Sequence, residues 1–385
     1  MLRWLLRSNE FKRIYNKYFS NRIKIRFEVF DKVNKEISKN FQHELKRVLN
    51  LKNDIEILDY EEKFYKLFKK IFNGRYCIGT NSGRVSLYLS LIANRIKKGD
   101  EVIISSFTPV YPVISILQAG CKPKFVEIDE KTFTIDPGEI EDKISEKTKF
   151  IIPIHLYGNS CEMEKILKLA KKHDQIIIED CAQALFTTYK GKMLPFTDIG
   201  CFSFYTGKII GGFGYGGLIV TKNKKFVKRV KNIMNPLSNS LLVLQNVGPV
   251  NLEVIQMAFI KSKLPFTNKW IRKRREIAKI YDEELNGYVD IPKVQEKTFH
   301  TYYRYVIRTK HRDKLFFYLL RKGVETKIDP LYPAHLHEIV KKKCGKISLP
   351  ITEKVGKEIL ALPSHQYMKE EDVFYVTKLI KNFLR

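Results

Sequence analysis

Short apolar strands alternate with helical segments through the central part of the chain, and this alternation constrains the fold more than any other feature. Runs of apolar residues predict strands, and a 3.6-residue periodicity predicts helices. Because parallel strands need a crossover connection, the pattern favours an α/β domain around a mostly parallel sheet, with ligands beyond the carboxyl ends of its strands. The predicted strands are 102–105, 124–128, 150–155, 175–179, 200–205 and 217–221, and the predicted helices are 85–94, a segment after Pro112, 162–172 and 224–234.

Other helical segments flank this domain. At 385 residues the chain is longer than a usual single domain. We predict a basic helical extension over residues 1–50, a large domain over 51–240 and a smaller α+β domain over 241–385. The flanking elements expected are helices at 31–50, 60–72, 269–285, 312–322 and 370–383 and a strand at 303–308.

The net charge of +28 fits an anionic partner of some kind, but its sign does not identify that partner. Basic runs such as those starting at Lys222 and Arg272 lie on predicted helices without a nucleic-acid motif, so we do not expect nucleic-acid binding. The six cysteines show neither metal-ligand pairing nor a disulfide framework, so we expect reduced thiols, no metal site and a cytoplasmic location. No apolar run is long enough for a transmembrane helix.

Polar residues follow one buried-type strand directly. Ile176, Ile177 and Ile178 lead into Glu179-Asp180-Cys181-Ala182-Gln183, so at least one carboxylate reaches the edge of the sheet beside small residues. A carboxylate buried there needs a cationic partner.

Lys208 lies between an aromatic strand and a glycine-rich loop, in the stretch S-F-Y-T-G-K-I-I-G-G-F-G-Y-G-G that runs from Ser203 to Gly217. Glycines allow a planar ligand to approach the backbone, and a lysine in apolar surroundings is a nucleophile for carbonyl groups. Taken alone, Lys208 is equally explained as one more surface lysine.

A third constellation, G-T-N-S-G-R from Gly79 to Arg84, precedes the helix expected at 85–94. Backbone N–H groups at a helix start bind phosphate, although a serine cap and a turn glycine account for the same letters. A phosphate cradle, a carboxylate and a lysine together are the set that pyridoxal phosphate requires, because the carboxylate keeps the pyridine nitrogen protonated and the lysine forms the imine.

The sequence resembles the DegT/StrS family of nucleotide-sugar aminotransferases, which are fold-type I pyridoxal-phosphate enzymes. The resemblance runs from about Tyr60 to the C-terminus. It rests on GDEVIISSFTP from Gly99, AGCKPKFVEID from Ala119, PIHLYG from Pro153, EDCAQA from Glu179, DIGCFSFYTGK from Asp198, YYRYVIR from Tyr302 and LPITEKVGKEILALP from Leu349.

The resemblance implies a role for each matching position. Lys208 carries the cofactor as a Schiff base, Asp180 contacts the pyridine nitrogen, and Gln183 contacts the phenolic oxygen. It also implies transfer of an amino group from L-glutamate to a keto group of a nucleotide-linked sugar, by a homodimer whose sites are completed by the partner. Ser82, Gly83, Arg84 and Ser203 hold the phosphate, and His335 lies on the substrate side.

Several positions depart from the family pattern. Arg84 stands where threonine is usual, and Pro109 stands where an aromatic ring stacks on the cofactor, so Tyr111 or Phe107 takes that place. Tyr215 replaces an acidic residue and Asp329 a histidine. The family's asparagine-arginine pair, which reaches the cofactor phosphate in the neighbouring subunit, is not reproduced cleanly, and Asn246 or Asn251 could take its place.

Two other functions fit the same scaffold. Sugar dehydratases of this kind carry histidine in place of the lysine, and Lys208 argues against that activity. A catalytically inactive binding or regulatory relative would explain the departures, whereas the retained Lys208, Asp180, Gln183 and Ser203 favour an enzyme. For the basic N-terminus, which includes Trp4, we hypothesise peripheral contact with an anionic membrane; the alternative is a helical extension that packs on the dimer.

Overall fold

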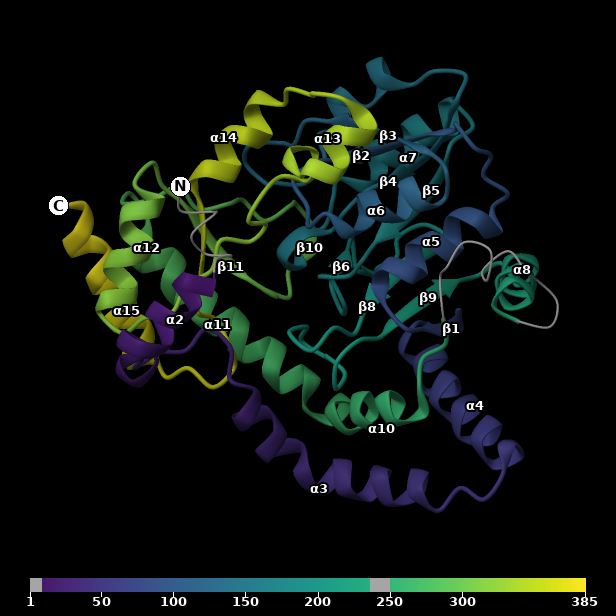
Figure 1. Cartoon of the computed structure of the whole chain (residues 1–385), viewed down its shortest axis with the longest axis horizontal. Coiled ribbons are helices and arrows are strands. Elements are labelled where there is room, and N and C mark those ends of the chain that lie inside the picture. The colour runs from purple at the N-terminus through teal and green to yellow at the C-terminus, as the bar shows by residue number, and fades with distance from the viewer. Residues whose placement is uncertain (1–8, 236–249) are drawn as a thin grey trace.

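The computed structural model describes residues 9–235 and 250–385. Its centre is a seven-stranded sheet in the order β1-β9-β8-β5-β4-β2-β3, which Figure 1 shows at the right of the molecule. The strands from β8 to β3 pair in parallel, and β9 is antiparallel to both of its neighbours. The expected α/β fold is therefore confirmed. The strands are β1 (Tyr76–Thr80), β2 (Glu101–Ser105), β3 (Lys122–Val126), β4 (Thr148–Ile152), β5 (Ile176–Asp180), β8 (Ile199–Ser203) and β9 (Gly217–Thr221).

Helices cover this sheet, so its strands are apolar almost throughout. In β4, Phe150, Ile151 and Ile152 are all buried, because a parallel sheet covered on both faces has no solvent side. A small sheet of β10 (Thr298–Phe299), β6 (Thr188–Tyr189) and β7 (Lys192–Met193) lies apart from it. The helices of this part are α4 (Asp54–Ile71), α5 (Gly83–Ala93), α6 (Tyr111–Gln118), α7 (Met163–Lys172) and α8 (Lys224–Met234).

The C-terminal part is built around a two-stranded antiparallel sheet of β11 and β12. The strand and helices predicted here are present, whereas α10, α13, α14 and β12 were not predicted. The elements are α10 (Val254–Lys263), α11 (Thr267–Leu285), β11 (Tyr305–Arg308), α12 (Arg312–Arg321), α13 (Glu338–Cys344), α14 (Pro350–Glu358), β12 (Ile359–Leu362) and α15 (Glu370–Leu384).

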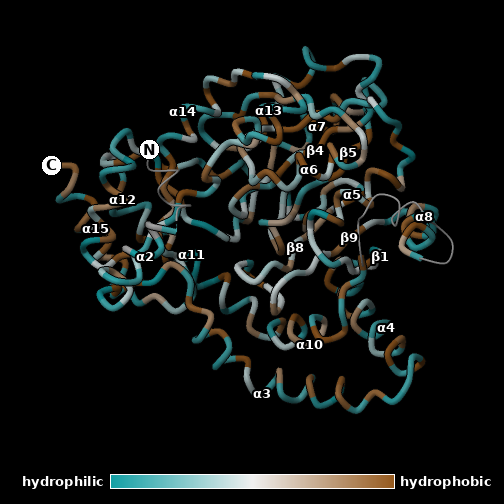
Figure 2. Tube along the Cα trace, in the orientation of Figure 1, coloured by the Kyte–Doolittle hydropathy of each residue, from teal (hydrophilic) through white to brown (hydrophobic). Residues whose placement is uncertain are grey.

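The N-terminal segment packs on the rest of the chain. After α2 (Asn9–Tyr18), the backbone N–H groups of Lys24 and Ile25 donate to the Gly323 carbonyl. The long α3 (Phe30–Leu49) then runs beneath α10, and Figure 2 shows hydrophilic and hydrophobic stretches alternating along it. Its residue Ile37 packs on Phe259 and Trp270. The proposed boundaries at residues 50 and 240 stay a prediction.

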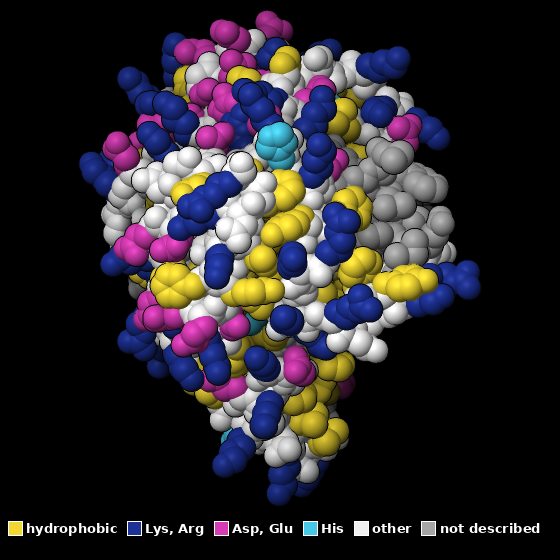
Figure 3. Space-filling view, turned by 90° about the vertical axis from the view of Figure 1, so that its left-hand side faces the viewer, with side chains coloured by type: hydrophobic (Ala, Val, Ile, Leu, Met, Phe, Trp, Pro, Cys, Tyr) yellow, Lys and Arg dark blue, Asp and Glu magenta, His cyan; other side chains and the backbone are white. Residues whose placement is uncertain are grey.

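The positive charge is spread over the surface. Figure 3 shows Lys and Arg side chains distributed across one face with acidic side chains between them. All six cysteines are free thiols. Within the described ranges, no helix combines the length and apolar character needed to cross a bilayer.

Candidate active site

A cavity of about 1510 Å³ opens at the carboxyl ends of β5 and β8. These two strands are parallel neighbours, so their last residues, Asp180 and Ser203, arrive at the same edge of the sheet. Segments from distant parts of the sequence complete the wall. The cavity is lined by eight of the nine predicted site residues: Ser82, Gly83, Arg84, Tyr111, Asp180, Gln183, Ser203 and Lys208.

Asp180 presents a buried carboxylate to this cavity, with 4% of its surface exposed. Its backbone bonds to Pro153 and His155 fix it beside β4, and its Oδ1 accepts from the Ala182 N–H at 2.9 Å. Burial raises the pKa of Asp180, and the Ala182 N–H and Lys208 only partly offset this effect. A cation placed against the carboxylate would restore its charge, as a protonated ring nitrogen does.

Lys208 follows β8 in a tight turn, where its N–H donates to the Tyr205 carbonyl at 2.8 Å. Its Nζ lies 4.5 Å from the centre of the Tyr303 ring, so an aromatic face borders the amine. The glycines beyond it are required sterically: a Cβ on Gly211 would lie 2.3 Å from the Thr206 carbonyl oxygen. Sequence reasoning missed Tyr303, although it lies in the quoted motif YYRYVIR.

Three backbone segments form a close-packed cradle at the start of α5. Ser82 caps this helix, and its Oγ accepts from the Val85 N–H at 3.3 Å. A Cβ on Gly83 would lie 2.9 Å from the Cβ of Ser203, and a Cβ on Gly217 would lie 2.5 Å from the Ser82 backbone. Free N–H groups at this helix start, beside the Ser82 and Ser203 hydroxyls, suit a phosphate.

The remaining residues predicted to contact the cofactor differ in their hydrogen bonds to other residues and in their exposure. Arg84 donates from Nη1 to Gln118 Oε1 at 2.5 Å, so part of its guanidinium is already used. Gln183 accepts the Tyr157 N–H at 2.9 Å through its Oε1. Tyr111 is 61% exposed, so its ring is not packed into the protein. A further residue in the wall, Thr108, has a buried hydroxyl with no hydrogen-bond partner in the described structure and could bond a ligand.

His335 does not reach the cavity. It is buried, its Nδ1 lies 2.6 Å from Ser106 Oγ, and its Nε2 lies 3.3 Å from Glu353 Oε1. The geometry therefore gives His335 a structural link between the two parts of the chain in place of the predicted substrate contact. Of the two asparagines expected to reach a partner's phosphate, Asn246 lies outside the described residues, and Asn251 is exposed and does not line the cavity.

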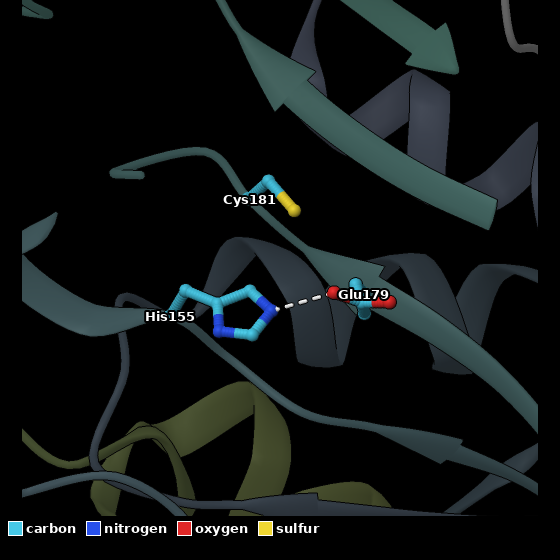
Figure 4. Close-up of side chains that lie close together, drawn as sticks. All are labelled: His155, Glu179 and Cys181. Atoms are coloured by element: carbon cyan, nitrogen blue, oxygen red, sulfur yellow. Dashed lines mark hydrogen bonds and ion pairs between the residues drawn. The ribbon is translucent and has the colours of Figure 1, made fainter. Parts of the chain in front are cut away.

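One buried cluster beside the site has the composition of a metal centre. Figure 4 shows His155, Glu179 and Cys181 facing one another. Their polar atoms are already bonded: His155 Nε2 lies 3.0 Å from Glu179, His155 Nδ1 accepts the Cys161 N–H, and Glu179 also accepts from the Phe196 and Thr197 backbone. A metal ion would have to displace these bonds. We therefore assign the cluster to holding β5, and with it Asp180, in place.

The cavity thus has the residues that pyridoxal phosphate needs: a cradle for its phosphate, a buried carboxylate for its ring nitrogen and an amine for its aldehyde. These features define the class of protein as a pyridoxal-phosphate enzyme. When bound, the cofactor supplies an electron sink for bond breaking at the amino-bearing carbon.

Comparisons with known proteins agree with this geometry. The pattern of the DegT/DnrJ/EryC1/StrS aminotransferase family matches residues 35–381. A pleiotropic regulatory protein of Geobacillus stearothermophilus is 34% identical over 85% of this chain and 90% of its own length. GDP-perosamine synthase of Escherichia coli O157:H7 is 34% identical over 84% of this chain and 90% of its own. The crystal structure of NtdA from Bacillus subtilis with bound cofactor PMP superposes with a TM-score of 0.82, at 25% identity, over 94% of this chain and 85% of that one.

The chain belongs to the DegT/DnrJ/EryC1/StrS aminotransferase family. It is an aminotransferase that uses pyridoxal phosphate. Lys208, Asp180 and the residues of the cradle, Ser82, Gly83 and Ser203, line the same cavity.

Proposed function

We propose that this enzyme transfers an amino group from L-glutamate to a keto group of a nucleotide-linked sugar, for glycan or polysaccharide biosynthesis. The observation that carries the proposal is the convergence of Lys208, Asp180 and the Gly83–Ser203 contact on one cavity. The cavity is large enough for a substrate much bigger than an amino acid, and a relative is named GDP-perosamine synthase.

The proposal divides the work among this chain's residues. Lys208 would hold the cofactor through its amine and would carry protons in both half-reactions. Asp180 would pair with the ring nitrogen, and Gln183 would contact the phenolic oxygen. Tyr111 would cover the ring in place of the aromatic residue that Pro109 replaces. The phosphate contacts come from Ser82, Gly83, Arg84 and Ser203.

A half-reaction assay tests this function. L-glutamate should shift the absorbance of the cofactor-loaded protein to that of its aminated form, and a keto-sugar nucleotide should restore the original spectrum. Lys208→Ala should abolish both conversions, whereas Lys225→Ala, at an exposed lysine of α8, should leave them unchanged. A protein that stays colourless with added cofactor, or turnover that persists in Lys208→Ala, would contradict the proposal.

The retained lysine also separates this function from the alternatives. A dehydratase of this scaffold would carry histidine in place of Lys208 and would release a deoxygenated keto-sugar, not an aminated one. An inactive regulatory relative would have no reason to keep Lys208 and Asp180 directed at one cavity.

We infer further that the enzyme is a homodimer. Three aromatic side chains that line the cavity are more than half exposed, Tyr111 61%, Tyr205 51% and Tyr215 68%, and so is Phe213, at 68%, in a smaller neighbouring pocket. Aromatic groups of this size are typical of the centre of an interface. Light scattering should give the mass of two chains, and Phe213→Asp should lower it to one. A wild-type protein that stays monomeric at assay concentration would exclude the dimer.

The packing of the N-terminal segment favours a cytoplasmic protein over one held at a membrane. Tyr15 and Phe19, two aromatic residues of the basic segment, pack against the hydrophobic core. Residues 1–8, including Trp4, lie outside the described residues. Co-sedimentation with anionic liposomes should be equal for the full chain and for a chain lacking residues 1–8. Pelleting that depends on these residues would support the membrane hypothesis.

A further inference from the structure

Arg304 places a buried guanidinium in the wall of the cavity, at the residue just before β11. The group lies between two rings, with its central carbon 4.5 Å from the centre of Tyr303 and 4.6 Å from that of Phe27. Tyr303 is also the ring that faces the Lys208 amine. Arg304 and Lys208 therefore border the same aromatic side chain.

Most of the hydrogen-bonding capacity of Arg304 is unused. A guanidinium has five N–H donors, yet among the described residues this one makes a single hydrogen bond, from Nη2 to Glu28 Oε1 at 2.8 Å. Its Nε is buried and has no hydrogen-bond partner within the described ranges, although it forms an ion pair with Asp329 Oδ2 at 3.6 Å. Arg304 is only 9% exposed, and its Nε is buried away from bulk water.

Glu28 holds a carboxylate against this guanidinium. Its Oε1 also lies 2.8 Å from Lys327 Nζ, so one oxygen bridges two cations. The same oxygen would lie 3.2 Å from a Cβ on Gly207, which is the residue before Lys208. Burial alone would raise the pKa of Glu28, but Lys327 and Arg304 outweigh it and lower that pKa, so the side chain is ionised at neutral pH. An anion therefore already lies beside the backbone of the residue that precedes Lys208.

The N-terminal segment presents Glu28 from outside the main domain. Lys24 and Ile25 donate to the Gly323 carbonyl, and the Glu325 N–H donates to the Ile25 carbonyl. The Phe27 N–H donates to Glu325 Oε2 at 2.9 Å. The backbone next to Glu28 is thus fixed, while the Glu28 side chain can turn away from Arg304 without moving it.

We propose that Arg304 and Lys327 form a subsite for a carboxylate group of the substrate, and that Glu28 occupies this subsite until the substrate displaces it. The proposal rests on the proposed function and names a recognition element of that same site. The bound group is a carboxylate because a carboxylate is what the structure shows there, and because a guanidinium with free donors binds carboxylates through paired hydrogen bonds. It comes either from the amino donor or from an acidic sugar.

Binding of glutarate, a dicarboxylate that cannot transaminate, tests the subsite without turnover. Calorimetry on the cofactor-loaded enzyme should show binding that weakens at least about tenfold in Arg304→Gln and strengthens by about three- to tenfold in Glu28→Gln, because the variant loses the competing charge. Arg304→Lys should recover part of the affinity, since lysine keeps the positive charge but lacks the paired N–H donors of the guanidinium. Equal affinity in wild type and Arg304→Gln would overturn the subsite, and equal affinity in wild type and Glu28→Gln would overturn the displacement.

Lys327→Gln gives an independent variant at a more exposed position, should Arg304→Gln fail to fold. It should weaken glutarate binding about threefold or more, and unchanged binding would overturn the role of Lys327. Thermal unfolding of each variant separates loss of fold from loss of binding.

The two half-reactions distinguish the sources of the carboxylate. A higher KM for L-glutamate in Arg304→Gln, with the keto-sugar step unchanged, assigns the subsite to the amino donor. A loss confined to a nucleotide-linked keto-uronate, but not to the matching neutral keto-hexose, assigns it to the sugar. If the wild-type protein never forms the cofactor absorbance band, the proposed function itself fails, which is a different result from unaltered binding in the variants.

Discussion

Lys263 is a buried lysine in a second, smaller cavity behind Lys208, and replacing it should change the pH dependence of stability. It is 4% exposed, and its Nζ donates to the Gly211 carbonyl at 2.6 Å and lies 4.3 Å from the centre of the Phe259 ring. Burial lowers the pKa of Lys263 from 10.5 to about 7. Lys263→Met removes the titrating group and keeps a similar apolar stem.

The sign of the effect follows from proton linkage. Below about pH 7 the lysine is charged in both the folded and the unfolded chain, so the folded state bears the full cost of burying a charge. Between pH 7 and 10.5 only the unfolded chain binds the proton, so stability rises with pH. At about 1.4 kcal/mol for each pH unit, the cost of the charge in acid is about 5 kcal/mol at most. It should fall by about 2 to 3 kcal/mol between about pH 6 and pH 9.

Urea unfolding of wild type and Lys263→Met at several pH values measures this difference. Lys263→Met should be more stable than wild type at about pH 6, by the cost of the buried charge minus the contribution of the lost hydrogen bond to Gly211. This difference in stability should shrink as the pH rises. Lys225→Met removes the same charge from the exposed surface of α8 and should show no such trend. A difference between wild type and Lys263→Met that is constant from about pH 6 to pH 9 would refute the reasoning.

Two further substitutions test the cradle and the contact between the two parts of the chain. Gly83→Ala would bring a Cβ within 2.9 Å of Ser203 Cβ, so urea unfolding should show a loss of about 1–3 kcal/mol in stability. Dialysis of the loaded enzyme should show that the variant retains its cofactor less well. Unchanged retention would contradict the cradle. Glu127 accepts from the Ile351 N–H and from the N–H and hydroxyl of Thr352, so Glu127→Gln should cost about 1–3 kcal/mol of stability while the absorbance of bound cofactor stays the same. A spectral change in Glu127→Gln would show that this contact reaches the site.

The elements that the sequence predicted share a strong periodic signal, and those it missed lack one. Strands β4 and β5 each contain three consecutive apolar residues, because both faces of the sheet are covered. Helix α10 was missed because it is buried on several sides: Met257, Phe259 and Lys263 are all inside, so no polar face marks its period. Strand β1 is only five residues long with Gly79 inside it, and it is held by its pairing with β9.

The site residues likewise fall into those that the sequence could predict and those that it could not. Lys208, Asp180 and Ser203 could be predicted because each follows a recognisable strand and matches a family motif. Glu28 and Arg304 could not, because a contact between residues so far apart in sequence depends on how the N-terminal segment crosses the cavity. His335 matched a motif, yet its ring is turned to Ser106 and Glu353, which a motif cannot show.

The cavity around Lys208 contains several charged side chains, and their partners define the surroundings of this amine. Four carboxylates line the cavity, and each has another partner: Asp180 accepts the Ala182 N–H, Glu28 bridges Arg304 and Lys327, Glu325 accepts the Phe27 N–H, and Asp329 lies 3.6 Å from Arg304 Nε. The group that borders the Lys208 amine is the ring of Tyr303. If the substrate carboxylate takes the place of Glu28, it joins Arg304, so the bound anion and the amine of Lys208 are both arranged around this one aromatic ring.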